Sequence, residues 1–270
     1  MKISAYVPFF NNSQTILPAL ESLREQTIPP DEIFALDDGS TDGGSELVED
    51  HGFRCLSQHS NQGRGAVRQR AMLEASGELV VSCDATNVLP PHFIESLLPW
   101  FDDPTVAAVY GWIQDPHPKG AVGRWRARHL FKAGHPMTIR HKSPLITYGT
   151  ILRRSAALDV GNFNPAFRHS EDGELGERLL AAGWDTIFDP RVPVICNVQN
   201  TLLEALERYW RWYVGVADRV SLLGYLRNVV YSVKCTAMID LAHGDIPVAL
   251  ISLLCPHLQF IMSHLHNLDK

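Results

Sequence analysis

Short apolar runs alternate with amphipathic stretches along the first half of the chain. The runs that are typical of buried strands lie at residues 3–8, 32–36, 53–57, 78–83 and 107–113. Stretches with helical spacing of apolar residues lie between them, at residues 13–25, 44–52, 65–75 and 91–101. Strands that alternate with helices of this length form βαβ units, so the pattern predicts the α/β class, with a mainly parallel sheet flanked by helices.

The second half of the chain has a different pattern. An irregular region at residues 114–145 is followed by predicted elements in the order strand, short helix, helix and two short strands, and helix dominates after that. The predicted helices lie near 122–132, within 145–163 and at 170–184, and the short strands at 185–189 and 192–198. From Leu202 onward the chain reads as helix, with breaks near Gly224 and Gly244. We therefore expect a main domain at residues 1–223 and a helical C-terminal extension at residues 224–270.

The C-terminal extension contains a long stretch without charged side chains, residues 246–268. A helix that spans a membrane needs about 20 mostly apolar residues, which this stretch provides. Its Pro256, His257 and Gln259 favour instead a helix that packs on a protein core or lies at an interface. One helical stripe is apolar: Val248, Ile251, Leu254, Leu258, Ile261 and Leu265. Packing on the main domain or on a partner subunit is the simpler interpretation, and docking on a membrane surface is the alternative.

Composition and charge narrow the class of protein. The chain has 270 residues, of which 45% are hydrophobic and 20% charged, as in an ordinary globular protein. Its net charge of -6 argues against a nucleic-acid partner. The five cysteines form no CxxC pair and the N-terminus has no apolar leader, so we expect reduced thiols in a cytoplasmic protein.

Polar clusters follow four of the predicted strands. They read "PFFNN", "DDGSTDG", "SNQGRG" and "DATN" in chain order. Ligands of open α/β sheets bind at the carboxyl ends of the strands. The four clusters therefore predict one binding site at that edge of the sheet.

The second and third clusters each allow two interpretations. Asp37 and Asp38 can accept hydrogen bonds from a nucleotide base and a ribose, or they can form a turn before the next helix. The turn in "NQGRGAVRQRA" can bind an anion at a helix N-terminus, helped by its arginines, or it can be a plain connection.

Two later segments are also candidates. In "SEDGELGERL", Glu171, Asp172 and Glu174 cluster at a helix start, where the macrodipole stabilises carboxylates. One of them can instead act as a general base. In "LERYWRWYVG", Arg208 and Arg211 alternate with aromatic residues, which suits either core packing or the binding of a sugar or phosphate.

Taken in order, these segments resemble the family-2 glycosyltransferases, which have the GT-A fold. The matching pieces are "VPFFNN", "LDDGSTDG", "NQGRGAVRQRA", "SGELVVSCDATNVLPP", "RRSAALDVGNFN", "SEDGELGERLLAAGW" and "RYWRW", which cover residues 1–215. The resemblance implies an enzyme that transfers a sugar from a nucleotide-diphosphate sugar to an acceptor hydroxyl, with inversion of the anomeric carbon.

The resemblance also implies roles for single residues. It places nucleotide-sugar binding on Pro8, Phe10, Asn11, Asp37, Asp38, Arg68, Asp84 and Arg211. It places the metal-binding DxD motif on Asp84-Ala85-Thr86, and the catalytic base on Asp172, with Glu171 beside it. The donor it favours is a UDP-sugar, and the acceptor is a glycan or a lipid-linked sugar. Contact with the inner face of a membrane and a homo-oligomer are left open.

The chain departs from the family pattern at the predicted metal site. Thr86 and Asn87 stand where the family usually has carboxylates, and Asn197 stands near a usual histidine. Neutral oxygens can join a Mg²⁺ or Mn²⁺ shell but add no charge. We therefore expect weak metal binding at Asp84, Thr86 and Asn197, with arginines sharing the neutralisation of the diphosphate.

Three alternatives to a metal-dependent transferase follow from these residues. One is a metal-independent enzyme. Another is a nucleotide-sugar-binding protein that has lost catalysis. The third is a nucleotidyltransferase, which "PFFNNSQT" disfavours because it lacks a Gly-rich loop with a basic residue.

Overall fold

A computed structural model describes the backbone at residues 1–214 and 220–265 and the side chains at residues 1–209 and 220–264. By their contacts the residues form two compact units. The sheet unit comprises Met1–Gln114 and Pro136–Val198, and the helical unit comprises Asp115–His135 and Gln199–Lys270. The boundary expected at residue 223 stays a prediction, because a grouping by contacts does not show which part folds by itself.

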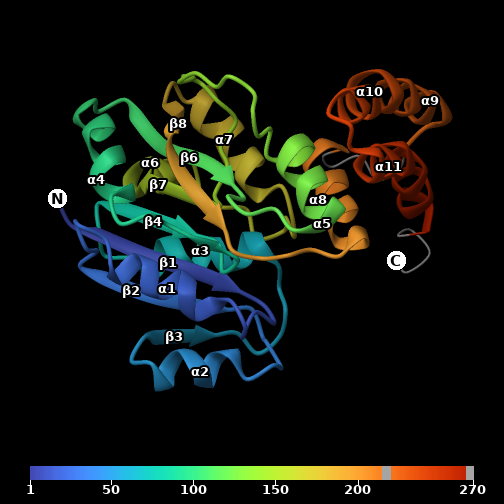
Figure 1. Ribbon diagram of the computed structural model, residues 1–270. Helices are drawn as coiled ribbons and strands as arrows, with labels where there is room; N and C mark the ends of the chain where they lie inside the picture. Colours follow the sequence, from blue (N-terminus) through green and yellow to red (C-terminus); the bar gives the residue numbers. More distant parts are fainter. Residues whose placement is uncertain (215–219, 266–270) are drawn as a thin grey trace. The chain divides into compact units, whose positions relative to one another are not determined.

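The strands of the sheet unit form one mixed sheet (Figure 1). They are β1 (Ile3–Phe9), β2 (Glu32–Asp37), β3 (Arg54–Ser57), β4 (Leu79–Cys83), β5 (Asn87–Val88), β6 (Val106–Gln114), β7 (Gly149–Arg153) and β8 (Asp185–Cys196). The order is β3-β2-β1-β4-β7-β6-β8-β5. The first four strands of this order, β3, β2, β1 and β4, are parallel to one another, and β6 is parallel to β8. The expected α/β class with a mostly parallel sheet is therefore confirmed.

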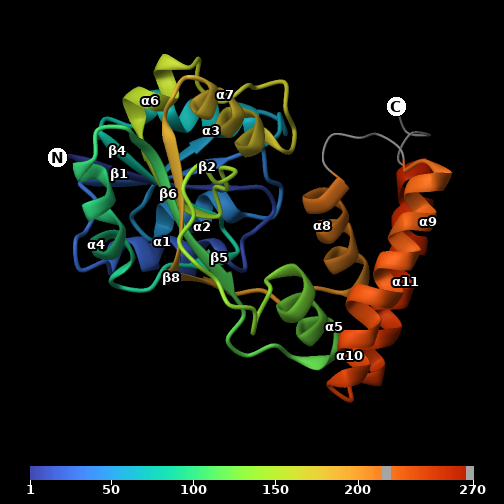
Figure 2. The ribbon, with the colours of Figure 1, turned by 90° about the horizontal axis from the view of Figure 1, so that it is seen from above.

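Helices cover both faces of this sheet. They are α1 (Ile16–Arg24), α2 (Gly44–Asp50), α3 (Arg64–Glu74), α4 (Phe93–Leu97) with the 3-10 turn η1 (Leu98–Asp102), α6 (Arg154–Asp159) and α7 (Glu171–Ala181). Figure 2 shows α3, α6 and α7 on one side of the strands and α1 and α4 on the other. The core under α3, α6 and α7 contains Phe34, Met72, Val80, Leu175 and Leu179, all fully buried. Burial of these apolar faces is what selects helices at these places.

Two expectations for the sheet unit were wrong in detail. Residues 87–88, expected to be loop, form β5, because Asn87 pairs with Cys196 of β8. The two short strands expected at 185–189 and 192–198 are one strand, β8. A shift of register between Tyr110 and Trp112 of β6 accommodates the residues between Phe188 and Pro193. A bulge of this kind lets a strand continue past proline residues.

The helical unit contains α5 (Gly120–Trp125), the π-helical turn η2 (Arg126–Leu130), α8 (Leu202–Val214), α9 (Leu222–Tyr231), the π-helical turn η3 (Ser232–Ala237), α10 (Met238–Ala242) and α11 (Ile246–Leu265). The break expected near Gly244 is confirmed by its φ of 68°. The break expected near Gly224 is confirmed as well, because α9 begins at Leu222 and Ser221 caps it by accepting the amide of Gly224 at 3.1 Å. Among the described residues, one segment, Ile246–His264, is long and apolar enough to cross a membrane.

Candidate active site

The loops after β1 and β2 are joined by two hydrogen bonds. The backbone N–H of Asn11 donates to Ser40 Oγ at 2.9 Å, and Asn11 Oδ1 accepts the N–H of Thr41 at 2.9 Å. Asn11 has a φ of 51°, a left-handed conformation that asparagine tolerates. The first two polar clusters therefore meet at one edge of the sheet, as their positions predict.

The carboxylates of Asp37 and Asp38 are buried and hold the neighbouring loops. Asp37 Oδ1 accepts the N–H of Ser40 at 2.8 Å. Asp38 accepts the N–H groups of Gln62 and Gly63 at 2.8 and 2.9 Å. These bonds satisfy two charges that could not be buried unpaired. The turn interpretation is confirmed for Asp37, whereas Asp38 holds the loop before α3 instead of the turn before α2. A role in nucleotide binding stays a prediction, since each oxygen keeps a free lone pair.

The N-terminus of α3 is closed by the chain itself. The N–H of Gly65 donates to the carbonyl of Phe167 at 3.0 Å. A Cβ on Gly65 would lie 2.2 Å from the carbonyl oxygen of Asn164, so no larger residue fits without a shift. The N–H of Gly63 donates to Asp38, as described above. Because the chain itself occupies these two N–H groups at the helix start, the plain-turn interpretation is favoured over an anion site.

Arg68 connects the predicted donor site with the predicted base. Its side chain is 2% exposed and projects from α3. Its Nη2 donates to Asp84 Oδ1 at 2.7 Å and its Nε donates to Glu171 Oε1 at 2.9 Å. Its Nη1 donates to Ser82 Oγ at 2.7 Å and to Tyr6 Oη at 3.2 Å. Three elements far apart in sequence, α3, β4 and α7, are thus held at one buried guanidinium.

Asp172 lies in the first turn of α7, next to this cluster. Its Oδ2 accepts a hydrogen bond from Thr147 Oγ1 at 3.3 Å. Burial, followed by the charge of Glu171, raises the pKa of Asp172 to about 6 from an ordinary 3.8, although Arg68 and the N–H of Gly173 act in the opposite direction. The carboxylate is therefore ionised at neutral pH and more basic than a free aspartate, which suits a general base.

The segment Thr147–Tyr148 connects β4 to the base, and sequence reasoning missed it. The carbonyl of Thr147 accepts Ser82 Oγ at 3.0 Å, and the carbonyl of Tyr148 accepts the N–H of Asp84 at 3.3 Å. Thr147 also reaches Asp172, as described above. A buried threonine within the apolar run "LITYG" was the available signal.

The three predicted metal ligands lie at neighbouring positions but provide one carboxylate. The N–H of Asn197 donates to the carbonyl of Thr86 at 2.9 Å, which brings β8 beside the loop of Asp84. Asn87 is buried: its amide nitrogen donates to the carbonyl of Tyr148 at 2.9 Å, and its amide oxygen, the atom that could bind a metal, has no hydrogen-bond partner within the described residues. Within the described residues no group of three or more His, Cys, Asp or Glu side chains could hold a metal ion.

The remaining predicted residues are placed as follows. Pro8 is half-buried in β1, where it pairs with Leu36 of β2, and Phe10 is 43% exposed at the end of the strand. Both lie at the sheet edge with Asn11. Arg211 belongs to α8, but its side chain lies outside the described residues, so its role stays a prediction.

Comparison with solved structures assigns the fold to the GT-A class. The mannosyltransferase PcManGT from Pyrobaculum calidifontis, in complex with GDP-Man and Mn2+, matches 100% of this chain and 88% of its own, with a TM-score of 0.64 and 19% identity. S. aureus TarS 1-349 in complex with UDP-GlcNAc matches 97% of this chain and 81% of its own, with a TM-score of 0.59 and 15% identity. At such identities the likeness shows the fold alone.

The sequence narrows this class to a family. The model of glycosyl transferase family 2 matches residues 4–161, more than half of the chain, so the chain belongs to this family. The putative glycosyltransferase EpsH of Bacillus subtilis is 34% identical over 108 residues, 38% of this chain and 31% of EpsH. The poly-beta-1,6-N-acetyl-D-glucosamine synthase of Staphylococcus epidermidis is 29% identical over 232 residues, 79% of this chain and 54% of the synthase. The chain spans about a third of the length of the curated relatives that it matches first.

Proposed function

We propose that this chain is an inverting glycosyltransferase that moves a sugar from a nucleotide-diphosphate sugar to an acceptor hydroxyl during polysaccharide or glycolipid synthesis. Membership of glycosyl transferase family 2 supports this proposal. So do the nucleotide sugars bound in the two similar structures and the polysaccharide made by one relative. We propose a UDP-sugar as the donor, a glycan or lipid-linked acceptor, and action in the cytoplasm.

One observation carries the proposal: Arg68 joins Asp84 to Glu171 within hydrogen-bond distance. Asp84 follows the strand at whose end the diphosphate would lie, and Glu171 precedes the proposed base, Asp172. The buried guanidinium of Arg68, which bonds to both carboxylates, fixes the donor side and the acceptor side of the reaction relative to each other. Positioning of this kind is a large part of what an enzyme contributes.

The reaction that this arrangement suits is a single displacement. Asp172 accepts the proton of the acceptor hydroxyl as that oxygen attacks the anomeric carbon from the face opposite the diphosphate. The bond between the anomeric carbon and the diphosphate oxygen breaks, and its electron pair leaves with the nucleoside diphosphate. General-base assistance contributes roughly 10²–10⁴-fold to such a step. We assign Glu171 a positioning role, through its bond to Arg68.

The nucleotide would lie against the ends of β1 and β2. Asp37 and Asp38 are fixed by backbone N–H groups, so their remaining lone pairs can accept hydrogen bonds without reorganisation. The exposed ring of Phe10 offers an apolar surface at the same edge. These features suit a base and a ribose but do not select one base.

Asp84, Thr86 and Asn197 are the residues that would hold a divalent cation. They fit a Mg²⁺ or Mn²⁺ that takes most of its anionic ligands from the substrate, because Asp84 is the one carboxylate among them and its Oδ1 is bonded to Arg68. When bound, the cation would neutralise charge on the departing diphosphate. We therefore expect the cation and the nucleotide to bind together.

The scarcity of carboxylates also favours a second candidate, a nucleotide-sugar-binding protein without transfer activity. The two candidates differ in what Asp172 does. A binder has no use for a half-buried, ionised aspartate beside a second, buried carboxylate, which costs stability. Substitution of Asp172 therefore separates them.

The experiment compares donor turnover by the wild type, by Asp172→Asn and by Glu177→Gln. Glu177 lies on the same helix and is exposed, so its variant controls for a change of charge on α7. We expect Asp172→Asn to lose roughly 10²–10⁴-fold in turnover with nucleotide affinity retained. Turnover within a few-fold of wild type would overturn the assignment of the base, and no turnover by any of the three proteins would favour the binder.

A further inference from the structure

The helices from α9 to α11 expose most of the large apolar side chains that the described chain exposes. Of 17 such side chains, 13 lie between residues 222 and 261. They are Leu222, Leu223, Leu226, Val230, Tyr231, Val233, Met238, Leu241, Ile246, Leu250, Leu253, Leu254 and Ile261, here called the apolar face. Along residues 222–242 and along α11, each of them has another member three, four or seven residues away, so these helices have an exposed apolar side. Exposure on this scale marks an interaction surface.

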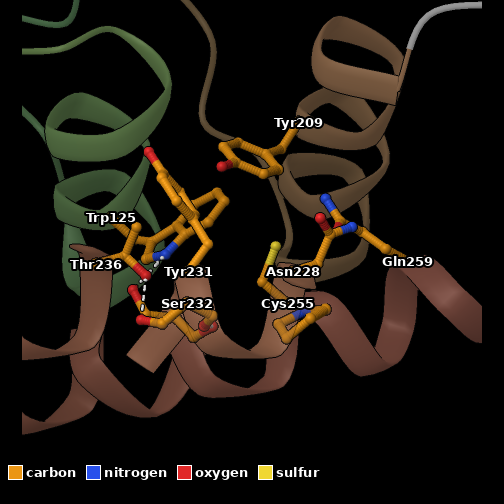
Figure 3. Close-up of a pocket in the computed structure, with 10 residues that line it drawn as sticks. Trp125, Tyr209, Asn228, Tyr231, Ser232, Thr236, Cys255 and Gln259 are labelled. Atoms are coloured by element: carbon orange, nitrogen blue, oxygen red, sulfur yellow. Dashed lines mark hydrogen bonds between the residues drawn. The ribbon is translucent and has the colours of Figure 1, made fainter. Parts of the chain in front are cut away.

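The buried sides of the same helices carry polar groups. On α11 these are Ser252, Gln259 and Ser263, which are at most 5% exposed. Ser252 Oγ accepts Trp125 Nε1 at 3.0 Å and donates to Asp240 Oδ2 at 2.6 Å. Figure 3 shows such groups around a cavity of about 180 Å³ within the helical unit. The inner sides therefore pair their polar atoms with one another.

This distribution is the reverse of that in a helix that faces water. A surface helix of a globular protein buries its apolar stripe and exposes its polar one. Here Leu250, Leu254 and Ile261 are 47–56% exposed, whereas Ser252 and Ser263 are at most 1% exposed. The apolar stripe expected from the sequence is thus divided, with Val248 and Ile251 inside. The outer side is suited to an apolar environment.

The charges of this region select the kind of partner. Arg227 and Lys234 are exposed, within the same helices as the apolar face. Both acidic residues between Val220 and His264 are withdrawn from solvent: Asp240 is fully buried, and Asp245 accepts Arg124 Nε at 2.7 Å. The whole chain carries a net charge of -6. Between Val220 and His264, by contrast, the exposed side chains that can carry a charge at neutral pH are Arg227, Lys234 and histidines. Anionic lipid headgroups complement such a surface.

We propose that the apolar face docks in the plane of an anionic lipid bilayer, with Arg227 and Lys234 at the headgroups. Arg227 and Lys234 disfavour a span by the helices that carry them. The one candidate span among the described residues, Ile246–His264, carries no such charge, but its inner side, with Ser252, Gln259 and Ser263, is buried against protein. The bond of Ser252 on α11 to Trp125, and the ion pair of Asp245, directly before α11, with Arg124, hold the inner side of this helix to protein, which leaves its outer side for lipid. A second copy of the chain would bring like charges together in a two-fold contact. This proposal does not rest on the transfer activity.

The test is co-sedimentation of the full chain with vesicles of phosphatidylcholine, alone or mixed with phosphatidylglycerol. We expect strong binding to the mixed vesicles, weaker binding to phosphatidylcholine, and release from the mixed vesicles by salt, since salt screens the headgroup charge. Circular dichroism and thermal unfolding of the same samples show that the chain is folded, whatever the vesicles do.

Two sets of variants separate the apolar and the ionic contributions. Leu222→Gln combined with Leu226→Gln and Leu250→Gln should abolish binding, whereas Leu73→Gln, at a leucine that is 62% exposed in the sheet unit, should not. Arg227→Gln with Lys234→Gln should weaken binding to the mixed vesicles by on the order of tenfold. Lys119→Gln with Lys142→Gln removes the same charge elsewhere and should have little effect.

Three results would overturn the proposal. The first is a folded chain that sediments with neither kind of vesicle. The second is a stable dimer in solution that the leucine variants dissociate, which would assign the apolar face to a second copy. The third is retention in the membrane after alkaline carbonate extraction, which would assign α11 to a span.

Discussion

The sheet unit and the helical unit both bury polar groups, but they differ in how these groups are arranged and in what the outer surface exposes. At the sheet edge, carboxylates are buried one beside another, and each of Asp37, Asp38 and Glu171 is held by an N–H donor. In the helical unit, Ser252 and Asp240 are buried, while leucines such as Leu223, 70% exposed, face outward. Buried polar groups at the sheet edge converge on one place, whereas those of the helical unit leave an apolar outer surface.

This difference shows how two kinds of function can be recognised. Buried charges cost stability unless they are paired, so a cluster of them at a sheet edge indicates chemistry. Exposed apolar side chains lower the solubility of a protein. A contiguous surface of such side chains therefore indicates a binding partner or a membrane. Each prediction below alters one side of this comparison.

The largest effect is expected from Arg68→Leu. This change leaves Glu171 and Asp84 without their cation, and the loss of one partner of a buried ion pair costs about 3–5 kcal/mol of unfolding free energy. Denaturant titration measures it. Arg70→Leu, on the same helix but partly exposed, should cost less than about 1 kcal/mol. Equal losses in both variants would show that Arg68 is not an organising residue.

A smaller effect, with a defined pH dependence, is expected from Asp172→Asn. Because the folded protein raises the pKa of Asp172 to about 6, the ionised form destabilises the fold above that pH, and the penalty disappears below the ordinary value of 3.8. The variant should therefore be more stable than wild type by about 1–3 kcal/mol near pH 8, and the gap should close as the pH falls.

Thermal unfolding over this pH range measures the difference. A gap that does not change with pH would contradict the raised pKa. The turnover of the wild type should also rise with pH through about 6, because the base must lose its proton before it can act.

Ser252→Ala tests the buried polar side of the helical unit. The change leaves Asp240 Oδ2 and Trp125 Nε1 without the hydroxyl that joins them, which should cost about 1–2 kcal/mol. Denaturant titration gives the value. A neutral result would indicate that these helices are held by apolar contacts alone.

The smallest effect is expected on the apolar face. Leu226→Gln and Leu250→Gln should each change the unfolding free energy by less than about 0.5 kcal/mol, since both side chains are more than half exposed. Denaturant titration in the absence of vesicles measures this change. A loss of about 2 kcal/mol or more would mean that these leucines are buried in solution, against the assignment to lipid.

The sequence predicted the sheet unit better than its site. Alternation of apolar runs located most of the strands, because β1, β2, β4 and β6 are mostly buried strands of a largely parallel sheet. It missed β5, whose two residues carry no apolar pattern and form a strand only through pairing with β8. Pattern reasoning could not foresee that pairing, which joins Asn87 to Cys196 across more than 100 positions.

At the site, residue types indicated the candidates but not their partners. Arg68 was expected to face the diphosphate, and its buried bonds to Asp84 and Glu171 depend on how α3, β4 and α7 pack. Thr147 was missed for the same reason. In the helical unit, periodicity predicted apolar stripes but could not tell which side of each helix would be covered.

The measurement that tests the proposed function most directly is calorimetric titration of nucleoside diphosphates, first with Mn²⁺ and then with a chelator. We expect one diphosphate, UDP first among the candidates, to bind at a single site, to bind more weakly after chelation, and to lose this metal dependence in Asp84→Asn. A folded chain that binds no nucleoside diphosphate under either condition would contradict the proposal that the sheet edge is a nucleotide-sugar site.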